Sequence, residues 1–105
     1  MAELSDRARE LLAKQRERYL ASLTGKHTEL ATLWEQRTHQ ELDLIDAVHR
    51  IAGSAGLHGL TELQSDAVHA EQTLRDENAS EADREAAVSK LMSELQANAS
   101  PAADD

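Results

Sequence analysis

The sequence contains no cysteine and no phenylalanine, and it has only one tryptophan, one tyrosine and one proline among its 105 residues. Without cysteine the chain has no disulfide, no thiolate metal ligand and no cysteine nucleophile. No apolar run approaches the roughly 20 residues that span a bilayer. The first residues are polar and acidic, unlike a secretory signal. We therefore expect a cytoplasmic protein that has no membrane partner.

Basic residues are also few: the sequence has 11 basic and 20 acidic residues, so the formal net charge is −9. A protein that binds nucleic acid needs a concentrated basic patch to contact phosphates. The basic residues between Arg7 and Arg18 are interleaved with acidic ones, a pattern typical of a solvated helix face. The composition therefore argues against nucleic acid as a partner.

The apolar residues recur at steps of three and four, which is the period of an amphipathic helix. The first periodic stretch begins at Leu4, Ala8, Leu11 and Leu12 and continues through Tyr19, Leu23, Leu30, Leu33 and Trp34. Gly25 interrupts this stretch. It either separates two helices or lies inside one long helix at a cost of about 1 kcal/mol, and the sequence leaves both interpretations open.

Three further helices are predicted. The second follows a capping box formed by Thr38 and Glu41 and buries Leu42, Ile45, Val48, Ala52 and Ala55. The third, with Thr61 and Gln64 as a candidate cap, buries Leu60, Leu63, Ala67, Ala70 and Leu74. The fourth follows a polar loop at 76–80, carries Ser80 and Asp83 in its first turn, and buries Val88, Leu91, Met92 and Leu95.

Short connections make neighbouring helices antiparallel. The expected fold is all-α: an up-down-up-down antiparallel four-helix bundle with an N-terminal helical extension. We assign residues 1–97 to the bundle and residues 98–105 to a disordered acidic tail. We expect the chain to be a stand-alone domain and a monomer.

The second predicted helix carries an unusual row of side chains around a histidine. Asp46, His49, Gly53 and Gly56 follow one another at helical steps, so they share one side of the helix. Glycine inside a helix costs roughly 0.5–1 kcal/mol relative to alanine. The simplest explanation for accepting this cost is accessibility: two positions without side chains leave the imidazole clear and let another protein approach the backbone.

This run resembles the histidine phosphotransfer (HPt) domain family of bacterial multistep phosphorelays. The shared pattern comprises a histidine, an aliphatic residue two later, a glycine four later, Ser-Ala, and a second glycine that ends the helix. Here these are His49, Ile51, Gly53, Ser54-Ala55 and Gly59. Many members carry lysine three residues after the histidine, where it can steady the phosphoryl group. This chain has Ala52 there instead.

The resemblance implies a helical bundle in which His49 accepts a phosphoryl group from the aspartyl phosphate of a response-regulator receiver domain and passes it to another receiver. The protein would be a relay intermediate and not an ATP-dependent kinase. It would need no cofactor of its own, since Mg²⁺ belongs to the receiver. Receiver domains and a hybrid histidine kinase are the implied partners. Around His49 we expect the partner-binding residues to be Asp46, Arg50, Gly53, Ser54, Gly56 and Leu57.

Two other interpretations remain open. His49 alone also fits an ordinary surface histidine, and the whole chain also fits a helical adaptor or inhibitor that docks a receiver or kinase without taking phosphate. The other histidines are interpreted as structural or solvated: His27, His39, His58 and His69. No pair of histidines has metal-binding spacing, and neither Glu35 nor Glu71 belongs to a Glu-x-x-His motif, so no metal site is expected.

Overall fold

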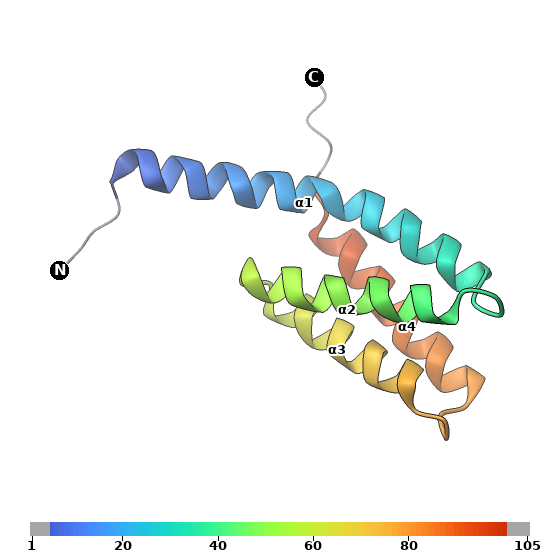
Figure 1. The fold of residues 1–105 in the computed structure, drawn as a ribbon. Helices are drawn as coiled ribbons and strands as arrows, with labels where there is room; N and C mark the ends of the chain where they lie inside the picture. Colours follow the sequence, from blue (N-terminus) through green and yellow to red (C-terminus); the bar gives the residue numbers. More distant parts are fainter. Residues whose placement is uncertain (1–4, 101–105) are drawn as a thin grey trace.

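The computed structural model describes residues 5–100, and four helices make up most of this range (Figure 1). They are α1 (Asp6–Glu35), α2 (Glu41–Leu57), α3 (Thr61–Arg75) and α4 (Glu81–Asn98). Consecutive helices run antiparallel and pack against each other, and α1 also packs against α4, which closes the bundle. The predicted four-helix bundle is confirmed.

The core consists almost entirely of aliphatic side chains, as the scarcity of aromatic residues requires. The largest side chains that are fully buried are Leu23, Leu30, Leu44, Leu63, Leu91, Leu95, Val48 and Val88. Among residues 5–100 no charged or polar residue is buried as a whole, so apolar burial is the main stabilising term of the bundle. No helix in this range is long and apolar enough to cross a membrane.

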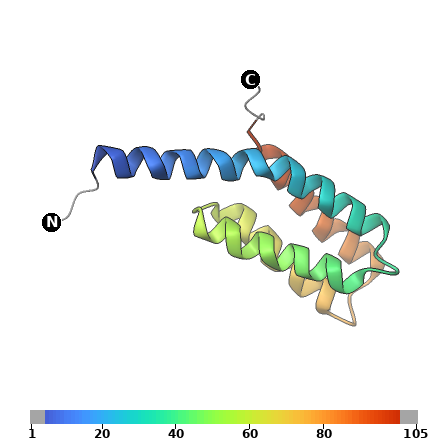
Figure 2. The same ribbon diagram turned by 45° about the horizontal axis from the view of Figure 1, so that its top comes forward.

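Helix α1 passes through Gly25 without a break, which settles the question that the sequence left open. Its N-terminal half projects beyond the other three helices in both views (Figures 1 and 2). Leu11 and Leu12 lie on this projection and are 54% and 52% exposed, whereas Tyr19 is the first buried residue. The predicted N-terminal extension is therefore confirmed, but its apolar stripe has no partner within the bundle. Leu4 lies outside the described residues.

We predict that Leu12→Ala changes the free energy of unfolding by no more than about 0.5 kcal/mol, because the side chain buries little surface that truncation would expose. Alanine also has a helix propensity at least as good as that of leucine. Chemical denaturation followed by circular dichroism measures this. A loss of about 2 kcal/mol or more would show that Leu12 is covered in solution.

The sequence predicts the residues at the start of α4 correctly, but the side-chain caps predicted for α2 and α3 are absent. At α4, Ser80 Oγ accepts from the Asp83 N–H at 3.0 Å and the Asp83 carboxylate accepts from the Ser80 N–H at 3.2 Å, so the two residues predicted for the first turn form a capping box with Ser80 as the N-cap. The candidate cap of α3 by Thr61 and Gln64 is wrong, because the N-cap is Leu60, without a side-chain hydrogen bond.

The predicted capping box of Thr38 and Glu41 is also wrong. Residues 36–39 form the turn that leaves α1, in which the N–H groups of His39 and Gln40 both bond to the Gln36 carbonyl. Thr38 lies within this turn, and Glu41 is the first residue of α2, whose N-cap Gln40 makes no side-chain hydrogen bond.

The other end of α2 follows the prediction. Gly59 has φ +73°, a left-handed conformation that residues other than glycine rarely adopt. The Leu60 N–H bonds to the Ala55 carbonyl at 2.9 Å and the Gly59 N–H to the Gly56 carbonyl at 3.1 Å. This pair of bonds is a Schellman motif, which ends the helix and turns the chain into α3.

Helix α4 extends through Asn98, a residue that the sequence assigned to the tail, and the Ser100 N–H donates to the Leu20 carbonyl at 3.2 Å. The chain is therefore tied to α1 three residues beyond the predicted domain boundary. The rest of the predicted tail, residues 101–105, lies outside the described residues.

Candidate functional site

One side of α2 faces solvent along the whole helix. At about 100° per residue, Leu42, Asp46, His49, Gly53 and Leu57 lie within an arc of roughly 80°. Leu42 is 81% exposed, Leu57 is 84% exposed, and the His49 side chain is 67% exposed. The helix thus presents an imidazole with a large exposed leucine about two turns away on either side.

The position of Leu42 corrects the sequence analysis, which placed it in the buried stripe. Two successive steps of three residues rotate the side chain by about 120° from the stripe's direction, because each such step falls about 60° short of a full circle. Val48 is fully buried, and Leu42, two such steps earlier, has turned out to solvent. The buried stripe of α2 instead consists of Leu44, Ile45, Ala47, Val48, Ile51, Ala52 and Ala55.

A carboxylate on the neighbouring helix holds the imidazole. His49 Nδ1 lies 3.0 Å from Glu71 Oε1 and 3.1 Å from Oε2. Glu71, in α3, is itself held by Arg75 Nε, which donates to Oε2 at 3.0 Å. Because a carboxylate can only accept hydrogen bonds, Nδ1 must carry the proton. In the neutral imidazole this leaves the lone pair on Nε2, the nitrogen that does not contact Glu71.

Glu71 is well placed to stay ionised. Its side chain is only 17% exposed, and this burial raises its pKa, but hydrogen bonds and charge interactions with His49 and Arg75 outweigh burial and hold the pKa below its ordinary value. The stabilising contribution of this carboxylate is therefore present above the pKa of the unfolded chain, and is lost as the pH falls through the lower pKa of the folded state. At neutral pH the carboxylate accepts from both partners.

Arg50 follows His49 in the chain but is engaged elsewhere. Its Nε donates to Asp46 on the same helix at 3.1 Å, and its Nη2 lies 4.0 Å from the Glu29 carboxylate on α1. Both Arg50 and Asp46 are exposed, so the pair is weak and easily rearranged. These two predicted partner-binding residues border the α1 side of His49.

Ser54 has a different environment from the other predicted partner-binding residues. It is half-buried, and its hydroxyl hydrogen-bonds the Tyr19 hydroxyl of α1 at 2.7 Å. Burial raises the pKa of Tyr19 despite the opposing effect of this hydrogen bond, so the phenol stays protonated. The Tyr19 ring also stacks on His58 at 4.1 Å, and Arg16 donates to the His58 carbonyl. Ser54 therefore joins α2 to α1 at the edge of the exposed side, and its contact with a partner stays a prediction.

The two helical glycines near His49 have different surroundings. A Cβ added at Gly53 would meet nothing within 4 Å, whereas one added at Gly56 would collide with the Gln64 side chain of α3. The colliding atoms are the far end of a flexible side chain that can move aside, so this contact does not by itself require glycine at position 56. Gly53 costs helix stability and has no packing reason, and its lack of a side chain leaves space beside the imidazole.

We predict that Gly53→Ala raises the melting temperature by a few degrees, since alanine in an open helical position stabilises by about 0.5–1 kcal/mol. The same methyl group should slow phosphoryl transfer from a receiver, because it stands one turn from His49. Gly25→Ala is the matched control, because it too is an open helical glycine with nothing within 4 Å. It should stabilise equally and leave transfer unchanged. Equal transfer rates in both variants would remove the functional role of Gly53.

Glu71 was not among the residues predicted around His49, because from the sequence it was considered only as a metal ligand. Glu71 directly follows the buried residue Ala70 in α3, so the helical period places Glu71 at the edge of the buried stripe. Which carboxylate of α3 contacts the imidazole depends on how α2 and α3 are aligned along each other. The sequence does not define this alignment, whereas the structure shows that it brings Glu71 to His49.

The remaining histidines and acidic residues do not form a second centre. His27 and His58 are half-buried, and His39 and His69 are exposed on separate elements. Within residues 5–100 no three histidine or carboxylate side chains gather closely enough to hold a metal ion.

In the comparison with protein families, the model described as Hpt domain matches residues 2–99 of the chain. No curated protein and no solved structure matches the chain. The family match extends over all four helices and therefore includes both His49 and Glu71.

Proposed function

The chain belongs to the Hpt domain family, which carries phosphoryl groups on histidine within phosphorelays, and from this premise we propose that His49 is its phosphoacceptor. One observation carries the proposal: His49 Nδ1 is held by Glu71, so the exposed imidazole offers its Nε2 lone pair to solvent. No other histidine of the described residues combines exposure with a carboxylate that fixes its tautomer.

The chemistry is a transfer between two side chains. The Nε2 lone pair attacks the phosphorus of an aspartyl phosphate on a receiver domain, the new N–P bond forms, and the P–O bond to the aspartate breaks. The aspartate leaves as a carboxylate with the bonding electron pair. The Nδ1 proton stays in place, and the positive charge that the ring acquires lies against the Glu71 carboxylate. The reverse reaction hands the group to a second receiver.

The receiver supplies most of the catalysis in this proposal. Phosphoryl transfer depends chiefly on positioning and on neutralising charge, which Mg²⁺ in the receiver provides. The role left to this chain is to present a nucleophile that is exposed, oriented and free of its proton at Nε2. It is a carrier in the relay and not a kinase.

We propose that the receiver docks on the exposed side of α2. Leu42 and Leu57 are its apolar anchors, about 22 Å apart along the helix with His49 between them. Both side chains are more than 80% exposed, so a partner that covers this side of α2 would bury apolar surface on each of them. Gly53 lets the partner approach the backbone, and the exposed pair of Asp46 and Arg50 borders the contact. A hybrid histidine kinase that carries a receiver would use the same surface.

A single experiment tests the acceptor role. The purified protein is mixed with a receiver domain phosphorylated on its aspartate in the presence of Mg²⁺, and the label is followed on both chains. We expect label on this protein that is lost in acid but survives in base, as a phosphohistidine requires, and that mass spectrometry maps to His49. If the protein binds receivers across a panel and takes label from none, the adaptor or inhibitor interpretation is correct instead.

A further inference from the structure

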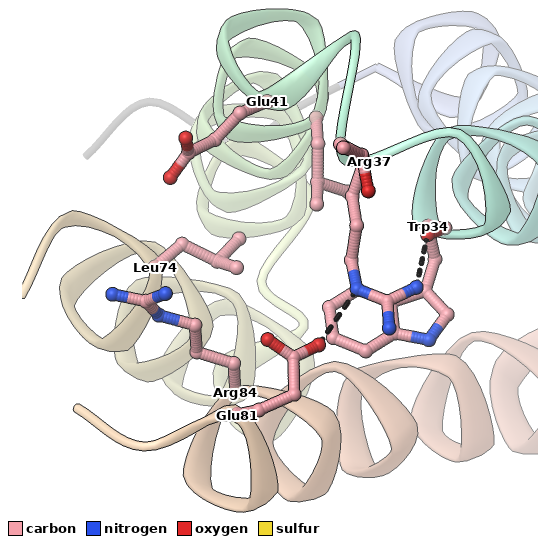
Figure 3. Close-up of a pocket in the computed structure, with 8 residues that line it drawn as sticks. Trp34, Arg37, Glu41, Leu74, Glu81 and Arg84 are labelled. Atoms are coloured by element: carbon pink, nitrogen blue, oxygen red, sulfur yellow. Dashed lines mark hydrogen bonds and ion pairs between the residues drawn. The ribbon is translucent and has the colours of Figure 1, made fainter.

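The projecting half of α1 holds cations that no other part of the described chain contacts. Outside this projection, residues 6–18, every basic side chain makes a polar contact within residues 5–100. Arg37, for example, donates to Glu81 at 2.8 Å and stacks on Trp34 at the opposite end of the bundle (Figure 3). On the projection, Arg16 donates to the His58 carbonyl. The other four basic side chains make no ion pair with a described residue: Arg7, Arg9, Lys14 and Arg18.

The projection also has the opposite charge to the rest of the chain. It carries five basic and three acidic side chains, a net charge of +2, and because the whole chain carries −9, the remainder carries −11. The helical period separates the two signs that alternate along the sequence, since the three carboxylates fall within an arc of about 40°. Another arc, of about 60°, holds three cations and one exposed leucine and no carboxylate. This basic face of α1 consists of Arg7, Leu11, Lys14 and Arg18.

The basic face points to the same side of the molecule as the exposed side of α2. Leu11 precedes Glu29 by 18 residues, which is five full turns, so both side chains leave α1 in the same direction. Glu29 Oε2 lies 4.0 Å from Nη2 of Arg50, the residue that follows His49. A partner that covers His49 therefore approaches α1 from the side of its basic face.

The basic face also lies within reach of a receiver docked on α2. Tyr19 is level with Ser54, because their hydroxyls are 2.7 Å apart, and His49 lies five residues before Ser54. At 1.5 Å per residue, Arg18 is about 9 Å and Leu11 about 20 Å from His49 along the bundle. A globular domain of about 100 residues has a radius of roughly 17 Å. Centred over His49, it covers Arg18 and meets Leu11 at its rim.

We propose that the basic face of α1 is a second contact for the receiver that docks on α2, an inference that rests on the proposed function. Charge complementarity favours this occupant. A receiver binds Mg²⁺ through carboxylate and phosphate oxygens, so the surface that it brings to His49 is acidic. A bundle with a charge of −11 repels such a surface, whereas the basic face attracts it and steers its approach. Leu11 adds an apolar contact at the rim.

A pair of charge reversals tests the contact. Lys14→Glu should raise the Kd for a receiver with Mg²⁺ about fivefold at low salt. Arg9→Glu is the matched control, because Arg9 is also an exposed cation of the projection but lies about 140° around the helix from Lys14. It changes the net charge equally and should change the Kd by less than about twofold. The difference between the variants should vanish at about 1 M salt. Equal effects at low salt would overturn the proposal.

Two adjacent leucines provide an apolar pair of variants. Leu11 and Leu12 are 54% and 52% exposed, and their side chains leave the helix about 100° apart. Leu11→Gln should raise the Kd about threefold, and this effect should persist at high salt. Leu12→Gln should leave the Kd unchanged. The rate of label transfer from a saturating phosphorylated receiver should stay at the wild-type value in all four variants, because His49 and Glu71 are intact.

The outcomes separate this contact from the acceptor role. If the wild type takes label on His49 but the members of each pair bind the receiver equally, the basic face is no contact and the acceptor role stands. If no receiver transfers label but Lys14→Glu still binds more weakly than Arg9→Glu, the contact stands and the acceptor role fails. Sedimentation equilibrium tests the other occupant. A wild-type dimer that Lys14→Glu dissociates, with receiver affinity unchanged, would assign this face to a second copy of the chain and overturn the proposal.

Discussion

Replacement of His49 by glutamine is expected to abolish phosphoryl acceptance, with a loss of at least about 1000-fold in the initial rate, because the carboxamide offers no nucleophilic nitrogen. The measurement is transfer of label from a phosphorylated receiver in the presence of Mg²⁺, with the wild-type chain alongside. His69→Gln is the matched control, since His69 is exposed on α3 and lacks a carboxylate partner among the described residues. It should accept label at the wild-type rate.

The same variant separates transfer from docking. Glutamine is close to histidine in size, and the two leucines proposed as anchors, Leu42 and Leu57, remain in place. We therefore expect the affinity for the unphosphorylated receiver to change by no more than about threefold. Persistent label in His49→Gln would mean that another residue is the acceptor. Loss of binding together with loss of label would mean that the imidazole is itself an anchor, and the variant would then no longer report on the chemistry alone.

The bundle was predictable from the sequence because the signals that define its helices lie in short stretches of the chain. The period of the apolar residues marks each helix, and short connections make the neighbours antiparallel. The break at Gly59 was visible for the same reason, since a single glycine supplies the left-handed residue that ends α2. His49 was predicted as the acceptor because a histidine beside a helical glycine has a recognisable spacing, and its role stays a prediction.

What the sequence did not reveal depends on contacts between elements. Two predicted caps failed because their residues make other contacts: Thr38 lies in the turn after α1, and the Gln64 side chain lies against Gly56 of α2. Leu42 was misassigned because its spacing from Ile45 is helical, although repeated steps of three carry it off the buried stripe. This error concealed half of the proposed docking surface.

Glu71 is the clearest case of a contact that only the fold can supply, and it leads to the second large effect. Glu71→Ala is expected to lower the transfer rate at saturating receiver by roughly 10- to 100-fold, the range for loss of one charge-assisted hydrogen bond. Because His49 is largely exposed, solvent will partly replace the lost partner, so the lower end of this range is expected. Glu62→Ala, which removes an exposed carboxylate from the first turn of the same helix, should have no effect.

Glu71→Gln distinguishes the two ways in which the carboxylate acts. The carboxamide oxygen can still accept from His49 Nδ1–H and keep Nε2 free of its proton, but it cannot stabilise the positive charge on the phosphorylated ring. Its rate should therefore fall between those of the wild type and Glu71→Ala. Nitrogen NMR of the His49 ring should show the Nδ1–H tautomer in the wild type and in Glu71→Gln, and a mixture in Glu71→Ala. If all three proteins share one tautomer population and differ only in receiver affinity, Glu71 belongs to the docking surface and does not position the nucleophile.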